Sequence, residues 1–266
     1  MNRPTDVAPW IERLARVGYA AKALLYATVG ILAAQAALGR GGRTTDTRGA
    51  LREVLGAPYG RAMLYVVAAG LFGYALWLVV RAVADPDGKG NGFKGIALRI
   101  GYLIRAVVHG ALAVGAVKLA RGDRAGGDEG AERWATRLME LPLGELLVWA
   151  AAAGIVGYGL YQLYRAFSPK LSRHLALGEL PAGTARWVMG VSRIGVAARG
   201  VVFCVIGYFF LQAAARHDPS EAGGVEASLR ALSDIGRWPF LVVALGLVAY
   251  GVYELVNARY RRIRVN

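Results

Sequence analysis

The chain has 266 residues, of which 56% are hydrophobic, and its mean hydropathy is +0.38. This composition is too apolar for an ordinary soluble domain. A net charge of +14 can accompany nucleic-acid binding, but the charges lie between long apolar blocks and no basic stretch is interleaved with aromatic residues. Nucleic acid is therefore excluded as a partner. A single cysteine, Cys204, excludes an internal disulfide and a cysteine-based zinc site.

Six apolar stretches are long enough to cross a bilayer, which takes about 20 residues. In chain order they cover residues 18–38, 62–80, 100–117, 146–164, 194–215 and 238–256. Tryptophans and tyrosines gather toward their ends, as amphipathic rings do at a membrane interface. The alanine-rich end of the first stretch also fits a cleaved signal peptide. We expect this stretch to be retained as a span, because it has two counterparts later in the chain.

The distribution of lysine and arginine predicts the orientation. With the N-terminus inside, the inner segments hold 19 of the 32 basic residues but 6 of the 18 acidic ones. The positive-inside rule then places both termini in the cytoplasm. The four arginines between residues 259 and 264 fit a position beside an anionic inner leaflet.

The six spans form three copies of one pair. The odd-numbered spans begin alike: Arg16-Val-Gly18 with Lys22, Arg99-Ile-Gly101 with Arg105, and Arg193-Ile-Gly195 with Arg199. The even-numbered spans share Gly70-Leu-Phe-Gly73-Tyr74, Gly154-Ile-Val-Gly157-Tyr158 and Gly246-Leu-Val-Ala249-Tyr250. The copies are offset by 83 and 94 residues in the first helix and by 84 and 92 in the second. Two helices with nearly the same offsets indicate an internal triplication.

The segments between the two spans of each copy are predicted to be short amphipathic helices. Residues 46–55, 128–141 and 220–235 each combine a capping residue, glycine and apolar residues at helical spacing. We expect them to lie on the outer face of the membrane.

These features predict an all-α membrane protein with six transmembrane helices in a single domain over residues 1–266. Because each copy has an even number of spans, the three helical hairpins point the same way, as parallel repeats with pseudo-threefold symmetry. The copies cover residues of about 10–85, 94–168 and 186–260.

On the repeated Arg-x-Gly-x3-Lys/Arg start and the Gly-x-x-Gly/Ala-Tyr motif, the chain resembles the domain-of-unknown-function 1206 family of bacterial membrane proteins, over residues of about 10–260. The third copy departs at Ala249 and at Asn257, where the other copies have glycine and arginine. The resemblance implies the architecture and the bacterial cell (inner) membrane as the location. It implies no activity.

Glycines on one stripe of each helix are expected to let the helices approach closely. The basic residues on the same stripe are candidates for a site. Lys22, Arg105 and Arg199 lie about 9 Å deeper than the arginines that open each span. A threefold arrangement would bring them together into an anion or lipid head-group site, with Arg16, Arg99 and Arg193 nearer the cytoplasm. The alternative is that they extend to the inner interface as ordinary anchors.

Two further residues stand out inside the spans. Glu254 is the only acid well inside a span, and pairing with Arg259, Arg199 or Lys22 would lower the cost of its burial. His109 lies where the other copies have Tyr26 and Phe203, so we expect an aromatic space-filler rather than a titrating group.

No enzyme motif or metal-ligand cluster is present, so we expect neither an enzyme nor a bound cofactor or metal. Gly90-Asn-Gly92-Phe-Lys-Gly95 spells a dinucleotide-binding pattern, but no strand precedes it, so we interpret it as a cytoplasmic loop after a turn at residues 85–88.

Two functions remain open. The first is a structural, lipid-interacting or accessory membrane protein, whose partners are membrane lipids, chiefly anionic ones. The second is a small-solute channel or transporter for anions, with a polar cavity lined by Lys22, Arg105 and Arg199. The absence of broken spans favours the first.

Overall fold

The computed structural model describes residues 9–85, 88, 90–123, 130–172 and 175–261 of the chain. Within these residues the fold is all-helical, and six helices are long and apolar enough to cross a membrane, which makes the chain a multi-pass membrane protein. The long helices are α1 (Pro9–Ala37), α3 (Gly60–Val83), α4 (Phe93–Arg121), α6 (Gly144–Phe167), α7 (Ala182–Arg216) and α9 (Arg237–Tyr260).

Each predicted span coincides with one of these helices, except that the first span runs one residue past the end of α1. The first long helix of each repeat, α1, α4 or α7, begins well before its apolar stretch. In α7 the early turns are amphipathic: Val188 and Ser192 are buried, whereas Arg186 and Arg193 are exposed. Packing of one face therefore continues the helix beyond the apolar residues. The predicted turn at residues 85–88 falls partly outside the described residues.

Three short helices join the two long helices of each repeat, as predicted: α2 (Thr47–Gly56), α5 (Gly130–Met139) and α8 (Val225–Ile235). Asp46 caps α2 by accepting hydrogen bonds from the backbone of Arg48 and Gly49 at 2.9 and 2.8 Å. A 3-10 turn, η3 (Pro219–Glu221), precedes α8, and hydrogen bonds from Ser220 hold the pKa of Asp218 below its usual value.

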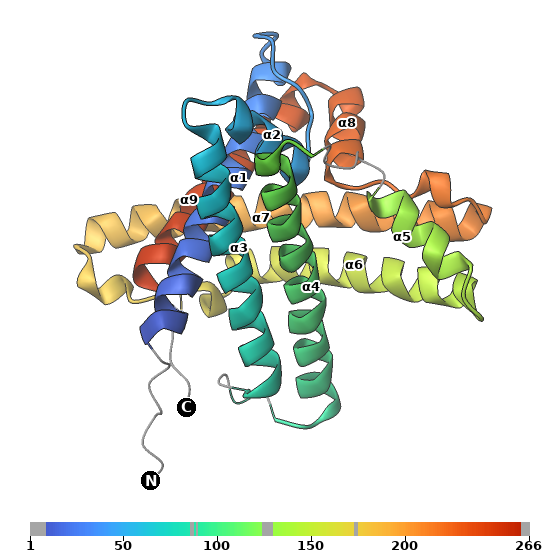
Figure 1. Cartoon of the computed structure of the whole chain (residues 1–266), viewed down its shortest axis with the longest axis horizontal. Helices are drawn as coiled ribbons and strands as arrows, with labels where there is room; N and C mark the ends of the chain where they lie inside the picture. The colour runs from blue at the N-terminus through green and yellow to red at the C-terminus, as the bar shows by residue number, and fades with distance from the viewer. Residues whose placement is uncertain (1–8, 86–87, 89, 124–129, 173–174, 262–266) are drawn as a thin grey trace.

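The segment between α6 and α7 contains two more 3-10 turns, η1 (Pro169–Leu171) and η2 (Leu177–Glu179). It is tied to the end of α9, because Ala176 donates a backbone hydrogen bond to the carbonyl of Tyr260 at 2.8 Å. The beginning of α1 reaches the same place, since Arg16 donates to the carbonyls of Ala258 and Arg259. The first and last helices therefore meet at one end of the molecule (Figure 1).

The long helices pack mainly as three pairs, α3 with α4, α1 with α9 and α6 with α7, and α1–α3 and α7–α9 contacts join the pairs. In Figure 1 the α3–α4 pair runs downward across the α6–α7 pair, which lies horizontally. The second helix of one repeat thus packs on the first helix of the next, and the third repeat packs on the first.

Two of these contacts between repeats use equivalent residues. A methyl group on Gly30 of α1 would lie 2.6 Å from the backbone nitrogen of Val248 in α9, and Gly207 of α7 meets Val156 of α6 in the same way. Gly251 likewise faces Ala23 and Ala27, and Gly159 faces the equivalent pair, Gly200 and Cys204. The small residues let backbones touch, as expected for helices in lipid.

The contact within a repeat is tight in the first and third copies but open in the second. A methyl group on Gly18 would lie 2.5 Å from Cβ of Tyr74, and Gly195 meets Tyr250 in the same way. For the equivalent glycine of the middle repeat, Gly101, no atom of the described residues lies within 4 Å of such a methyl group. The same is true of Gly154 and Gly157 on the second helix of this repeat. Helices α4 and α6 are therefore not packed against each other through these glycines.

This difference predicts opposite effects of one substitution. Gly18→Ala should lower the free energy of unfolding by about 1–3 kcal/mol, because the new methyl overlaps Tyr74. Gly101→Ala should be neutral or stabilising by up to about 1 kcal/mol, because its methyl meets nothing and alanine favours the helix. Unfolding of the purified protein in mixed micelles with increasing SDS measures both. Equal destabilisation by the two variants would show that α4 and α6 are packed together.

Candidate functional site

A buried ion pair joins the first and third repeats. Lys22 of α1 donates to Oε1 of Glu254 in α9 at 2.7 Å, and the two residues are 5% and 2% exposed. Tyr250, one turn before Glu254, donates to the same oxygen, and the Lys22 ammonium also lies 3.4 Å from the hydroxyl of Tyr74. Of the three partners expected for Glu254, the structure thus selects Lys22. The second oxygen, Oε2, is buried and has no hydrogen-bond partner among the described residues.

Arg199 of α7 is buried among aromatic rings. It donates to the hydroxyl of Tyr158 in α6 at 2.8 Å and to that of Tyr26 in α1 at 3.2 Å. Its guanidinium lies 4.7 Å from the ring centre of Phe203 and 5.0 Å from that of Tyr250. Cation–π attraction and two hydroxyl acceptors therefore replace a carboxylate in offsetting the cost of this buried charge.

The three second-helix tyrosines repeat one aromatic contact. Each packs edge-to-face on an aromatic side chain from the first helix of the next repeat, with centroid distances of 4.9, 4.9 and 4.7 Å. The pairs are Tyr74 with His109, Tyr158 with Phe203, and Tyr250 with Tyr26. His109 thus fills the place of an aromatic ring, and its Nδ1 lies 2.7 Å from the carbonyl of Arg105.

Arg105 differs from the other two cations because it is only half-buried. Its Nε donates to the carbonyl of Gly101 at 3.0 Å, one turn back along α4, and its guanidinium lies 5.0 Å from the ring centre of Tyr102. No ion pair joins Arg105 to a carboxylate within the described parts of the chain. Because Arg105 bonds to Gly101, its guanidinium points toward the end where α4 begins.

A single position on the second helix explains this difference. Glu254 in the third repeat, which faces Lys22 of the next repeat, corresponds to Gln162 and to Leu78 in the other two. Leu78, in the first repeat, therefore occupies the position that would face Arg105. The sequence thus supplies a carboxylate for Lys22, an amide at the Arg199 position and only an apolar side chain at the Arg105 position.

The three arginines that open the spans do not form a ring. Arg16 pairs with Glu12 at 2.6 Å and bonds the end of α9, whereas Arg99 donates to the carbonyls of Ala82 and Val83 at the end of α3. Arg193 is exposed on α7. These side chains satisfy helix ends or face outward.

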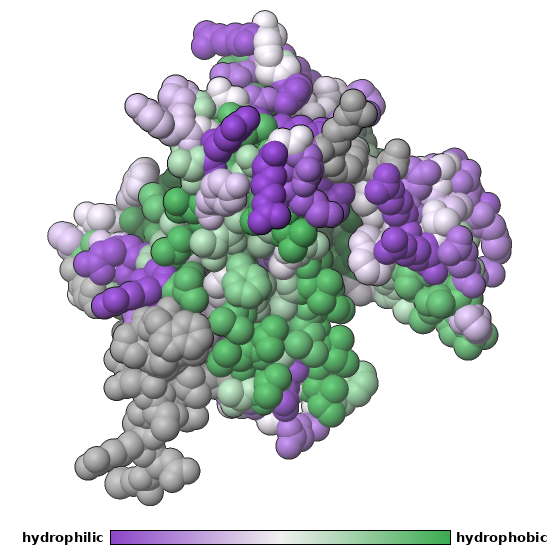
Figure 2. Space-filling model, viewed as in Figure 1, coloured by the Kyte–Doolittle hydropathy of each residue, from purple (hydrophilic) through white to green (hydrophobic). Residues whose placement is uncertain are grey.

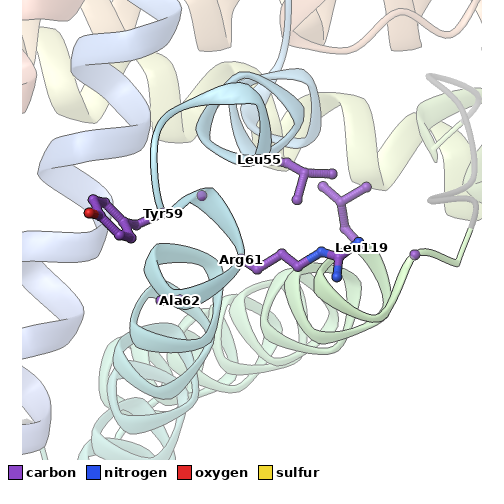
Figure 3. Close-up of a pocket in the computed structure, with 7 residues that line it drawn as sticks. Leu55, Tyr59, Arg61, Ala62 and Leu119 are labelled. Carbon is purple, nitrogen blue, oxygen red and sulfur yellow. The ribbon is translucent and has the colours of Figure 1, made fainter.

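Two pockets lie away from the buried cations, at the end of the molecule that carries the connecting helices. One is lined by residues of α2, α3 and α4, with the side chain of Arg61 extending across it toward Leu119 (Figure 3). The other lies around Asp46 and Arg52. Neither is lined by Lys22, Arg105 or Arg199. Within the described residues no group of three His, Cys, Asp or Glu side chains could hold a metal ion.

The second-helix tyrosines were not among the predicted site residues. In the structure the second-helix tyrosines supply hydroxyls or ring faces to the buried cations: Tyr74, Tyr158 and Tyr250. The side chain of Gln162 is also buried, and its amide nitrogen has no hydrogen-bond partner within the described parts of the chain. The available signal was that a cation and a tyrosine recur together in every repeat.

The arrangement defines a class of protein: a six-span helical membrane protein made of three repeats around a cluster of buried cations and tyrosines. A family model described as "Domain of Unknown Function (DUF1206)" matches three times, at residues 17–85, 100–168 and 194–261. The chain belongs to this family. Its copies coincide with the three repeats.

The chain is also 29% identical over 260 residues to "Uncharacterized protein YxxB" of Bacillus subtilis (strain 168). The match covers 97% of this chain and 94% of that protein, so the whole triplicated unit is shared. No solved structure shows a significant similarity to the chain.

The buried ion pair predicts a large cost for removing one partner. Lys22→Met should lower the free energy of unfolding by about 3–5 kcal/mol, because it leaves the carboxylate of Glu254 buried and uncompensated. Adding Glu254→Leu should recover most of that loss, since Leu78 already fills the equivalent position in the first repeat. The same unfolding measurement gives the coupling between the two residues. A matched control is the exposed pair of Arg216 and Glu221, whose loss should cost at most about 1 kcal/mol. Additive effects of the two buried substitutions would contradict the prediction.

Proposed function

We propose that the chain is a non-catalytic protein of the bacterial cell membrane that acts as a structural, lipid-interacting or accessory component. In this proposal the three repeats are related by a pseudo-threefold axis, from which the open middle repeat departs, and both termini lie in the cytoplasm. The equivalent contacts of Gly30 with Val248 and of Gly207 with Val156 support the symmetry. The excess of basic residues on the side of the termini supports the orientation.

The observation that carries the lipid-interacting role is the uneven burial of the spans. Only 22% of the apolar window of α4 and of α6 is buried, against 50–56% for the other four. Figure 2 shows continuous apolar surface over the lower parts of α3 and α4. Exposed side chains on α4 include Ile100, Leu103, Ile104, Val107 and Val108. A surface of this extent suits acyl chains or a partner helix.

The charge of Arg105 favours anionic lipid over a neutral lipid or a partner helix at this surface. Lys22 and Arg199 are enclosed by partners from their own protein, whereas Arg105 is half-buried beside the apolar face of α4 and is paired with no carboxylate in the described chain. With the termini in the cytoplasm, its guanidinium points back toward the inner leaflet. A phosphate head group would complete its hydrogen bonds.

Lipid retention tests this role. After reconstitution in nanodiscs with equal phosphatidylcholine and phosphatidylglycerol, native mass spectrometry should show preferential retention of phosphatidylglycerol. Arg105→Gln should lower that retention by at least about tenfold, the loss expected for one charge-assisted hydrogen bond of about 1.5 kcal/mol or more. Arg121→Gln, at the other end of α4, is the matched control and should change it little. Equal retention of the two lipids, or equal losses in the two variants, would rule the site out.

An anion channel or transporter is the second candidate. It is favoured by an excess of buried positive charge, since the described residues bury three cations, Lys22, Arg81 and Arg199, and one carboxylate, Glu254. It is opposed by the packing of tyrosines around both cations, which fills the space that a solute would need.

Flux through liposomes separates the two candidates. We expect proteoliposomes to pass chloride and phosphate no faster than protein-free liposomes, because tyrosine rings and the ion pair occupy the cation cluster. Flux that is abolished by Arg199→Gln in a protein that still folds would establish the channel instead.

A further inference from the structure

In the middle repeat, α4 and α6 have the residues that pack the two helices of the other repeats together, but in the structure these residues do not meet. In the first repeat Gly70 packs against Val17, and in the third repeat Gly246 lies near Ile194, which is the residue equivalent to Val17. The corresponding residues of the middle repeat, Gly154 on α6 and Ile100 on α4, do not meet: Gly154 faces open space and Ile100 is 51% exposed.

Among the helical glycines that face open space, three occupy positions that are packed in another repeat. Glycine is less favourable than alanine inside a helix, so a glycine that makes no close contact lowers the stability of its helix without allowing another helix to approach. Gly101, Gly154 and Gly157 are such residues here. A contact of α4 with α6 like those of α1 with α3 and α7 with α9 would use all three.

The cation of the middle repeat, Arg105, also lacks a contact that its counterparts make with the tyrosine of their own repeat. Within the first repeat Lys22 lies 4.5 Å from the ring centre of Tyr74, and within the third Arg199 lies 5.0 Å from that of Tyr250. In the middle repeat Tyr158 instead accepts from Arg199 of the next repeat, while Arg105 bonds its own backbone. Among the described residues, Arg105 and Tyr158 are the one cation–tyrosine pair of a repeat with no hydrogen bond or cation–ring contact between its members.

One side chain accounts for the separation. In the third repeat the Cβ atom of Ala198 lies directly against Gly246, and the first repeat also has alanine at this position, Ala21. The middle repeat has Ile104, which would meet Gly154 in the same contact. The larger side chain makes this interface weaker than its two counterparts without removing its other elements.

We propose that α4 and α6 close on each other as the other two hairpins do, and that closure brings Arg105 to Tyr158. Ile104 keeps the closed and open forms close in free energy, so this hairpin is the one that moves. Tyr158 keeps its contact with Phe203, just as Tyr74 keeps its contact with His109 while it faces Lys22. Closure is inferred independently of the proposed lipid site, although a head group bound to Arg105 would compete with Tyr158 and favour the open form.

Disulfide trapping tests this closure in membranes that contain the full chain. In the first repeat a methyl group on Gly73 would lie 2.7 Å from Cβ of Leu14, so the equivalent pair in the middle repeat reports contact of α4 with α6. This pair is Ala97→Cys with Gly157→Cys. Cys204→Ala provides the background, because the equivalent residue of the first repeat, Ala27, is already alanine.

Mild oxidation should give an intramolecular disulfide in the Ala97/Gly157 pair, more slowly than in the Leu14→Cys/Gly73→Cys pair, which is always in contact. Adding Ile104→Ala should speed the reaction by about tenfold, because the closed interface gains the alanine of its counterparts. Ile96→Cys with Gly157→Cys is the negative control, since the residue equivalent to Ile96, Arg13, is exposed in the packed first repeat.

Three results would overturn the proposal. The first is a rate for the Ala97/Gly157 pair no higher than that of the Ile96/Gly157 pair. The second is a disulfide found only between two chains, which would assign this interface to a second copy. The third concerns the contact of Arg105 with Tyr158. We expect Arg105→Gln to lower the rate of disulfide formation by at least about threefold and Arg121→Gln to leave that rate unchanged. Equal rates in these two variants would show that Arg105 does not reach Tyr158.

Discussion

The buried pair of Lys22 and Glu254 is the interaction on which the arrangement of the repeats depends. It joins α1 to α9, helices from opposite ends of the chain, and so connects the third repeat back to the first. In an apolar medium neither charge is tolerated alone, which makes the contact of these two helices obligatory rather than merely favourable. The tyrosines beside the pair, Tyr74 and Tyr250, then place α3 and the rest of α9 around it.

Triplication makes the departures from symmetry informative. The same position carries Leu78, Gln162 or Glu254, and the first-helix cation that it faces changes from half-exposed Arg105 to fully paired Lys22 accordingly. A second position carries alanine in two repeats and Ile104 in the middle one, and there the hairpin is open. Both departures concern α4. The middle repeat is therefore where lipid contact and movement are expected together.

Much of the fold could be predicted because lipid imposes simple rules. Twenty apolar residues must form a helix, since the bilayer supplies no hydrogen-bond partner for a free backbone group. The six spans, the three connecting helices and the triplication follow from such local patterns. The site could be predicted only in part. Lys22 was a candidate beside Arg105 and Arg199, but equal spacing in the sequence implied an equivalence that the structure does not show.

The sequence by itself determined the class of protein, the helices, the repeats and the residues that carry charge into the membrane. Only the tertiary structure decided which charges are paired, which glycines are used and which hairpin is open. The physical reason is that a span is specified by its own residues and by the bilayer. A pairing such as that of Lys22 with Glu254, 232 residues apart, depends on how helices from different repeats approach one another. That approach in turn depends on single side chains, such as Ile104, whose effect appears only against a neighbouring helix.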